Sequence, residues 1–285
     1  MPRLFCLGLG YTAQALARRL LKQGWQVGGT CREPGSAAAW RAEGIDAMIV
    51  DDSRPPADAD GMLTSATHLL ASIPPDAAGD PALRLWGPAI ARHGRLAWVG
   101  YLSTTGVYGN RDGGWVDETS PLAPTGERGQ RRVEAEAGWQ ALTAEDVPVH
   151  LFRLAGIYGP GRSALDTVRA GRAQRVVKPG QVFSRVHVDD IVQVLAASIA
   201  QPRPGAVYNV CDDNPAPPDE VIAHVCALLG VEPPPEIPFE TAPLSDMARS
   251  FYADNKRVSN RLIKEELGVR LLYPDYRAGL KALLG

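Results

Sequence analysis

A glycine-rich turn near the N-terminus constrains the fold more than any other feature of the sequence. The apolar run Leu4–Leu7 leads into Gly8-Leu9-Gly10-Tyr11-Thr12-Ala13, and apolar residues at 13, 16, 17, 20 and 21 then follow the spacing of one helix face. In such a strand, turn and helix unit, backbone N–H groups approach a pyrophosphate closely, and the helix N-terminus favours its negative charge. We therefore expect a Rossmann-type domain whose cofactor-binding residues include Gly8, Gly10, Tyr11, Thr12 and Ala13.

Short apolar runs alternate with helical patterns over the rest of the chain. The further runs are Trp25–Thr30, Ala47–Val50, His68–Ser72, Leu96–Tyr101, Val147–Phe152 and Val207–Val210. Helical patterns cover Pro81–Arg92, Gln130–Leu142, Asp189–Ala200, Pro218–Leu229, Ser259–Leu267 and Tyr276–Leu284. This alternation predicts an α/β fold, a doubly wound parallel sheet of seven strands with a small mixed C-terminal substrate-binding region.

The same pattern suggests how the chain is divided. We expect a dinucleotide-binding domain over residues 1–155, joined by the strand and helix near 185–212. Residues 156–184 and 213–285 would then form the substrate-binding region. Proline is dense at 202–218 and 233–243, which is typical of surface loops that cross between such regions.

Composition excludes several classes of function. The 285-residue chain has a formal net charge of −2, so it has no basic field to attract nucleic acid or an anionic membrane. No apolar stretch approaches the length of a membrane span. The cysteines and histidines lack metal-ligand spacing, so no metal site is expected. We expect a cytoplasmic monomer or homodimer with a small-molecule substrate.

The choice of cofactor depends on the end of the second strand. An NAD site usually places a carboxylate there for the ribose hydroxyls, whereas an NADP site places an arginine for the 2′-phosphate. Here Arg32 follows the strand and Glu33 comes next, so NADP is favoured, with NAD as the alternative. Arg32 as an ordinary solvated surface charge also remains open. Asp51 and Ser72, after the third and fourth strands, are further candidate cofactor contacts.

Four later segments, in the right order, resemble one enzyme family. They are Ser103-Thr104-Thr105-Gly106-Val107-Tyr108-Gly109, Arg153-Leu154-Ala155-Gly156-Ile157-Tyr158-Gly159-Pro160-Gly161, Arg185-Val186-His187-Val188-Asp189-Asp190 and Val207-Tyr208-Asn209-Val210. Together with the glycine turn, they resemble the extended short-chain dehydrogenase/reductase family, also called the NAD-dependent epimerase/dehydratase family. Many of its members act on nucleotide sugars.

The resemblance implies roles for individual residues. Thr104 would be the active-site residue that hydrogen-bonds a substrate oxygen, and Gly156 and Ile157 would line the nicotinamide. Facing the substrate would be Thr105, Tyr158, Arg185 and His187. From the residues alone, His187 also fits a hydrogen-bonded core histidine, and the threonines fit an ordinary strand end.

The sequence departs from the family at the catalytic step. The family carries Tyr-x-x-x-Lys on the helix after the fifth strand, where the tyrosine is the general acid/base. Aligning the stretch on Glu136 puts Arg128 at the tyrosine position and Arg132 at the lysine position. An arginine side chain is not a useful proton donor near neutral pH. This pattern resembles the family's atypical branch, in which the tyrosine is missing.

Catalysis therefore depends on substitutes for the missing pair. Arg132 could keep the electrostatic and ribose-binding role of the lysine, and Tyr108 is the nearest phenol on the same strand end. The first hypothesis is an NAD(P)-dependent oxidoreductase or epimerase that acts on a small polar substrate of the sugar-nucleotide kind. The alternative is an NADP-binding sensor or regulatory protein without hydride transfer.

Overall fold

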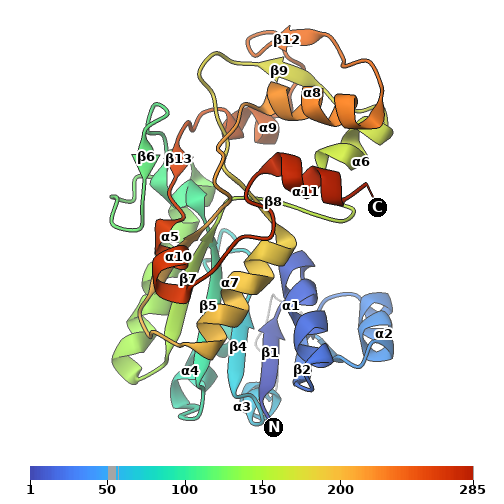
Figure 1. Cartoon of the computed structure of the whole chain (residues 1–285). Helices are drawn as coiled ribbons and strands as arrows, with labels where there is room; N and C mark the ends of the chain where they lie inside the picture. The colour runs from blue at the N-terminus through green and yellow to red at the C-terminus, as the bar shows by residue number, and fades with distance from the viewer. Residues whose placement is uncertain (51–55, 57, 285) are drawn as a thin grey trace. The chain divides into compact units, whose positions relative to one another are not determined.

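The computed structural model describes residues 1–50, 56 and 58–284. Its central feature is a seven-stranded parallel sheet in the order β11-β7-β5-β4-β1-β2-β3 (Figure 1). These strands are β1 (Arg3–Leu7), β2 (Gln26–Cys31), β3 (Asp46–Ile49), β4 (His68–Ala71), β5 (Trp98–Thr104), β7 (Val149–Leu154) and β11 (Val207–Val210). The predicted fold class is confirmed, and each of the seven predicted runs contains or overlaps one strand.

The chain divides into two compact units. The first unit comprises 1–104, 130–153 and 192–208, and the second comprises 105–129, 154–191 and 209–285. Helices that lie wholly in the first unit are α1 (Tyr11–Lys22), α2 (Pro34–Ala42), α3 (Ala59–Leu63) and α4 (Pro81–Arg92). Helices α5 (Glu127–Ala141) and α7 (Val188–Ala200) give most of their length to this unit.

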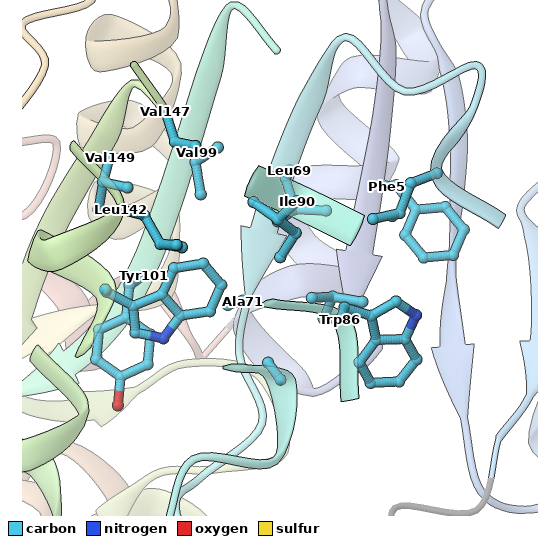
Figure 2. Packing of buried hydrophobic residues seen from close by; sticks show 14 of the residues in the cluster. Phe5, Leu69, Ala71, Trp86, Ile90, Val99, Tyr101, Leu142, Val147 and Val149 are labelled. Carbon is cyan, nitrogen blue, oxygen red and sulfur yellow. The ribbon is translucent and has the colours of Figure 1, made fainter. Parts of the chain in front are cut away.

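The main core of the first unit lies on one face of the sheet. Because successive strand side chains point to opposite faces, the odd-numbered residues of β1, β4, β5 and β7 share this face. They include Phe5, Leu69, Val99, Tyr101 and Val149, which Figure 2 shows beside Trp86 and Ile90 of α4. On the opposite face, the indole of Trp98 donates to Ser198 Oγ of α7 at 3.0 Å. Helices therefore cover both faces, as in a doubly wound sheet.

The second unit is built from short elements. Its strands form three parallel pairs, β10 (Arg185–His187) with β8 (Gly156–Tyr158), β12 (Glu236–Pro238) with β9 (Arg175–Val177), and β13 (Arg257–Val258) with β6 (Trp115–Val116). Its helices are α6 (Ala164–Arg169), α8 (Pro218–Leu229), α9 (Asp246–Phe251), α10 (Arg261–Leu267) and α11 (Tyr276–Ala282). Leu165, Val221, Tyr276 and Leu280 pack α6, α8 and α11 into a small core with Tyr158.

Most differences from the sequence prediction concern short elements. Helix α2 was not predicted, although Pro34 occupies its first turn, where a proline is well tolerated. The two- and three-residue strands of the second unit give too little periodicity to be detected. None of the helices in the described part of the chain is long and apolar enough to cross a membrane.

Candidate functional site

The glycine turn lies where β1 and β4 end side by side. These two strands are neighbours at the point where the strand order reverses, the usual ligand position in an open α/β sheet. Gly8 has φ +91°, and an added Cβ would meet Ile73 Cγ1 at 2.8 Å. Its N–H donates to Thr30 Oγ1 at 2.9 Å, and Ser72 Oγ donates to its carbonyl at 2.7 Å. Ser72 therefore shapes the turn through its side chain.

The N-terminus of α1 has the properties of an anion site. Gly10 is the N-cap in an extended conformation, no side chain caps the helix, and its first turn contains no acidic residue. The first N–H groups of a helix lack intrahelical partners and carry partial positive charge. Tyr11 is half-buried and Thr12 and Ala13 are buried, so the helix is anchored while its first turn starts at the sheet edge. These residues fit a bound pyrophosphate.

The residues expected to select the cofactor lie at the end of β2. Arg32 and Glu33 are both exposed directly after the strand, and Glu33 is the N-cap of α2 without capping it through its side chain. Neither side chain is therefore tied to the start of that helix. Asp51, the other adenine-side candidate, lies outside the described residues.

The end of β5 is held by a buried ion pair in the first unit. Arg153 donates to both carboxylate oxygens of Glu136, with its Nη2 at 2.7 Å from Oε2. Ser103 Oγ donates to Glu136 Oε1 at 2.5 Å. All three side chains are buried, with exposed fractions of 4% or less. The residue before Thr104 is thus fixed, and Thr104 itself is half-buried.

Arg132, which we expected at the lysine position, is bonded to the same strand. Its Nη1 donates to Leu102 O at 2.7 Å and to the Tyr101 phenol at 2.9 Å. The guanidinium also lies over the Tyr101 ring, 5.7 Å from its centroid. Arg128, which we expected at the tyrosine position, is exposed. Nη1 of Arg132 is therefore bonded to the strand. Only the other nitrogens of the guanidinium could donate to a ligand.

Tyr108 lies in the second unit, in the short 3-10 helix that starts at Thr105. Its side chain is fully buried, and its phenol donates to Asn209 Oδ1 at 2.7 Å. The backbone N–H of Asn209 in turn donates to Glu118 Oε1 at 2.8 Å. Thr105 is half-buried. Proton donation from Tyr108 to a substrate would require its bond to Asn209 to break.

The residues expected on the substrate side lie on two paired strands of the second unit. Register places Gly156 beside Arg185, Ile157 beside Val186, and Tyr158 beside His187. The Tyr158 and His187 rings meet edge to face, with centroids 5.2 Å apart. The structure thus brings the predicted residues of both segments together.

His187 is buried and uncharged. Its exposed fraction is 1%, and its Nδ1 lies 3.2 Å from the Asp189 N–H, from which it accepts. Burial lowers the pKa of His187, although Asp189 acts in the opposite direction. The proton of the neutral ring is therefore on Nε2, for which the described residues offer no hydrogen-bond partner. This donor is available to another group.

Sequence reasoning missed two residues with unusual environments in these regions. Glu136 served only to align the helix, yet it forms the buried ion pair with Arg153. Asp212, two residues after β11, has an exposed fraction of 2%, and burial raises its pKa to about 8. The sequence alone does not show that a carboxylate in a helix or after a strand is buried. That depends on which residues of the folded chain pack against it.

Two close relatives in sequence cover almost the whole chain, although no family model matches it. A structure of a functionally unknown conserved protein from Silicibacter pomeroyi is 54% identical, with a TM-score of 0.91, and the match covers 99% of this chain and 98% of that one. Protein YeeZ of Escherichia coli (strain K12) is 29% identical over 287 residues, which cover 96% of this chain and 97% of that protein.

More distant structures indicate the type of fold. A Methylobacillus flagellatus protein, provisionally described as an NAD-dependent epimerase/dehydratase, is 27% identical, with coverages of 99% and 97% and a TM-score of 0.70. The dTDP-glucose 4,6-dehydratase of Bacillus anthracis in complex with NAD is 15% identical, with coverages of 100% and 96% and a TM-score of 0.80. The chain therefore belongs to the family of the Silicibacter pomeroyi protein and has the fold of the NAD-dependent epimerases and dehydratases.

Proposed function

We propose that this chain binds NADP, in preference to NAD, and acts as an oxidoreductase or epimerase on a small polar substrate of the sugar-nucleotide class. The observation that carries the proposal is the turn at Gly8 and Gly10. It lies at the reversal point of the sheet, and it leads into a helix N-terminus with neither a capping side chain nor an acidic residue in its first turn. The Bacillus anthracis dehydratase, which shares the fold, was solved with NAD, and this supports a nicotinamide cofactor.

Each proposed cofactor contact has a specific task. Gly8, Gly10, Tyr11, Thr12 and Ala13 would present the loop and helix N-terminus to the pyrophosphate. Arg32 would hold the 2′-phosphate that distinguishes NADP from NAD, because a guanidinium binds phosphate through two parallel N–H donors. We assign residues 1–155, together with the strand and helix near 185–212, to the dinucleotide-binding domain, and residues 156–184 and 213–285 to the substrate-binding region.

The proposed chemistry needs a positioned substrate oxygen and a route for a proton. Bound NADP would supply reversible hydride transfer. Thr104 would hydrogen-bond the reacting oxygen, and the ion pair of Glu136 and Arg153 would keep the end of β5 rigid through Ser103. Arg132 would contribute positive charge through its remaining donors. Dehydration is disfavoured, since the family's dehydratases carry an Asp-Glu pair where this chain has Thr105-Gly106.

Turnover with a substrate panel tests the enzymatic proposal. NADPH oxidation and NADP reduction would be followed with sugar nucleotides and simple carbonyl compounds, beside a Thr104→Val variant. We expect turnover with at least one substrate, reduced at least about tenfold in Thr104→Val because a hydrogen bond to the reacting oxygen is lost. Tight NADPH binding without turnover of any substrate would contradict it.

The alternative is a cofactor-binding sensor, and the two arginines favour it. Arg128 and Arg132 replace the family's tyrosine and lysine, and Arg132 is bonded to Leu102 O and the Tyr101 phenol. The double variant Arg128→Tyr with Arg132→Lys separates the two functions. Activity that appears only in the double variant supports a sensor built on an enzyme scaffold, whereas turnover by the parent protein excludes it.

A further inference from the structure

The second unit contains a group of polar atoms that the hydrogen bonds of the fold leave unused. Arg185 begins β10 and is half-buried. Its Nη1 donates to Phe183 O at 2.8 Å and to Ala216 O at 3.0 Å, which fixes the guanidinium in place. Across the described ranges 1–50, 56 and 58–284, its Nε and Nη2 have no hydrogen-bond partner. Two donor nitrogens of a rigidly held cation are thus unused.

Asp212 is held next to Arg185 by the backbone. Its N–H donates to Arg185 O at 2.7 Å, and its Oδ1 accepts from the Asn214 N–H at 3.2 Å. Its Oδ2 is buried and has no partner in the described part of the chain. The charge of Arg185 acts on Asp212, yet the two side chains form no ion pair in that part. A buried carboxyl therefore lies within electrostatic range of a cation without forming an ion pair with it.

Tyr276 adds a third unused group. Its exposed fraction is 1%, and its hydroxyl is buried with no partner among the described residues. The Arg185 guanidinium carbon lies 6.0 Å from the centroid of its ring. Buried polar atoms are nearly always hydrogen-bonded in native proteins, so several orphans around one cation call for an explanation. A bound polar ligand would supply partners for such atoms.

The protonation states decide which kind of ligand fits. Burial raises the pKa of Asp212 to about 8, against the lowering effect of Arg185, and Asp213 and Asp275 raise it further. Tyr158 and Cys211 also face this carboxyl, since its charge acts on both. Burial lowers the pKa of Arg185, but a guanidinium stays charged across the physiological range. Near pH 7 the group therefore offers donors and one net positive charge.

We propose that Arg185, Asp212 and Tyr276 bind the carboxylate group of a small-molecule ligand. A carboxylate has two coplanar oxygens, which match the parallel N–H donors of Arg185. It can accept in addition from the Asp212 O–H and the Tyr276 hydroxyl. A neutral hydroxyl would leave the positive charge unbalanced. The inference rests on the proposed function in one respect, because it takes this ligand to be the substrate. The substrate would then be an acidic sugar or another hydroxylated acid.

Matched pairs of probes test the site in the wild-type protein. D-Glucuronate and D-glucose differ at one carbon, as do UDP-glucuronic acid and UDP-glucose. Binding would be followed by calorimetry and by NMR of 13C-labelled tyrosines, with the Tyr276 signal assigned from Tyr276→Phe. We expect each acid to bind at least about tenfold more tightly than its neutral partner and to shift the Tyr276 signal. Equal affinities within both pairs would overturn the proposal, as would binding of inorganic phosphate in preference to glucuronate.

Two variants and the pH dependence of binding test which residues produce the preference for the acid. Arg185→Gln should abolish the preference for the acid. Arg277→Gln should keep it, because Arg277 lies over the same Tyr276 ring but is exposed. Raising the pH from 7 to 9.5 should weaken binding to the wild type as Asp212 ionises, and it should have little effect on Asp212→Asn. An equal pH response in both proteins would overturn the role of Asp212, even if Arg185→Gln fails to fold.

An NADPH titration of the same samples separates this site from the proposed function. If the protein binds glucuronate but does not bind NADPH, the carboxylate site is supported and the proposed function is contradicted. Binding of NADPH without a preference for the acids removes the carboxylate site and leaves the proposed function intact.

Discussion

Replacing Glu136 by glutamine tests whether the buried ion pair holds the end of β5. The substitution keeps the shape of the side chain but removes the charge that faces Arg153, whose exposed fraction is 4%. It also replaces one of the two carboxylate oxygens that accept from Arg153, of which Oε1 accepts from Ser103 as well. Breaking a buried pair on one side typically costs about 3–5 kcal/mol, because the remaining charge stays desolvated.

The loss should be visible in thermal unfolding. For a folding unit of this size, about 1 kcal/mol lowers Tm by about 2–4 °C, so we expect a decrease of about 6–20 °C. Glu134→Gln is the matched control, since Glu134 is exposed on the same helix and, among the described residues, accepts a hydrogen bond only from Gln130. It should change the free energy of unfolding by no more than about 0.5 kcal/mol.

A double variant tests whether the unbalanced charge, and not the loss of packing, causes the loss of stability. Glu136→Leu with Arg153→Met removes both charges, and it should recover much of the stability lost in Glu136→Gln. The reasoning would be refuted if Glu136→Gln and Glu134→Gln had the same Tm, because loss of the Glu136 carboxylate beside the buried Arg153 guanidinium could not then be costly.

Three further predictions follow from single sites. Gly8→Ala should destabilise the protein by about 1–2 kcal/mol or more in thermal unfolding, since Gly8 has φ +91° and its Cβ would meet Ile73. Gly10→Ala should cost no more than about 1 kcal/mol, the usual loss on placing alanine at an N-cap, because within 4 Å its Cβ would meet only Ser72 Oγ among the described residues, at 3.6 Å; equal losses in the two variants would refute the argument. Arg32→Ser should weaken NADPH binding about tenfold or more in calorimetry and leave NADH unaffected, whereas parallel losses for both cofactors would contradict a 2′-phosphate contact. Asp212→Asn should be more stable than the wild type at pH 7 in melts from pH 3 to 9. Burial raises the folded-state pKa of Asp212 to about 8, so the wild type loses no stability to this carboxylate below pH about 4, and the loss grows up to pH about 8. A stability difference between Asp212→Asn and the wild type that does not change with pH would contradict this.

The sequence predicted the long elements well because their patterns are strongly periodic. Helices α4 and α8 have the predicted bounds, Pro81–Arg92 and Pro218–Leu229, and β11 is the predicted Val207–Val210. Each has a proline at the helix start or a bounded apolar run, and such signals are local. The position of the glycine turn beside β4 depends on the strand order, which only the structure gives.

The polar environments could not be predicted in the same way. Glu136 and Arg153 are 17 residues apart, and Arg185 and Asp212 are 27 apart, so only the tertiary structure brings them together. Burial of these groups depends on the side chains that cover them, which no local pattern encodes. Arg132 illustrates the limit, since its alignment with a lysine suggests a ligand contact but gives no hint of its bonds to Tyr101 and Leu102.

Calorimetric titration of the wild type and of Gly10→Glu with NADPH and with NADH tests the central proposal most directly. The Gly10→Glu carboxylate would stand at the N-cap of α1, where it would compete with a bound pyrophosphate. We expect micromolar binding of NADPH to the wild type, weaker binding of NADH, and loss of both in Gly10→Glu. A wild-type protein that binds neither cofactor would contradict both the oxidoreductase and the sensor, and would leave a fold that has lost the function of its glycine turn.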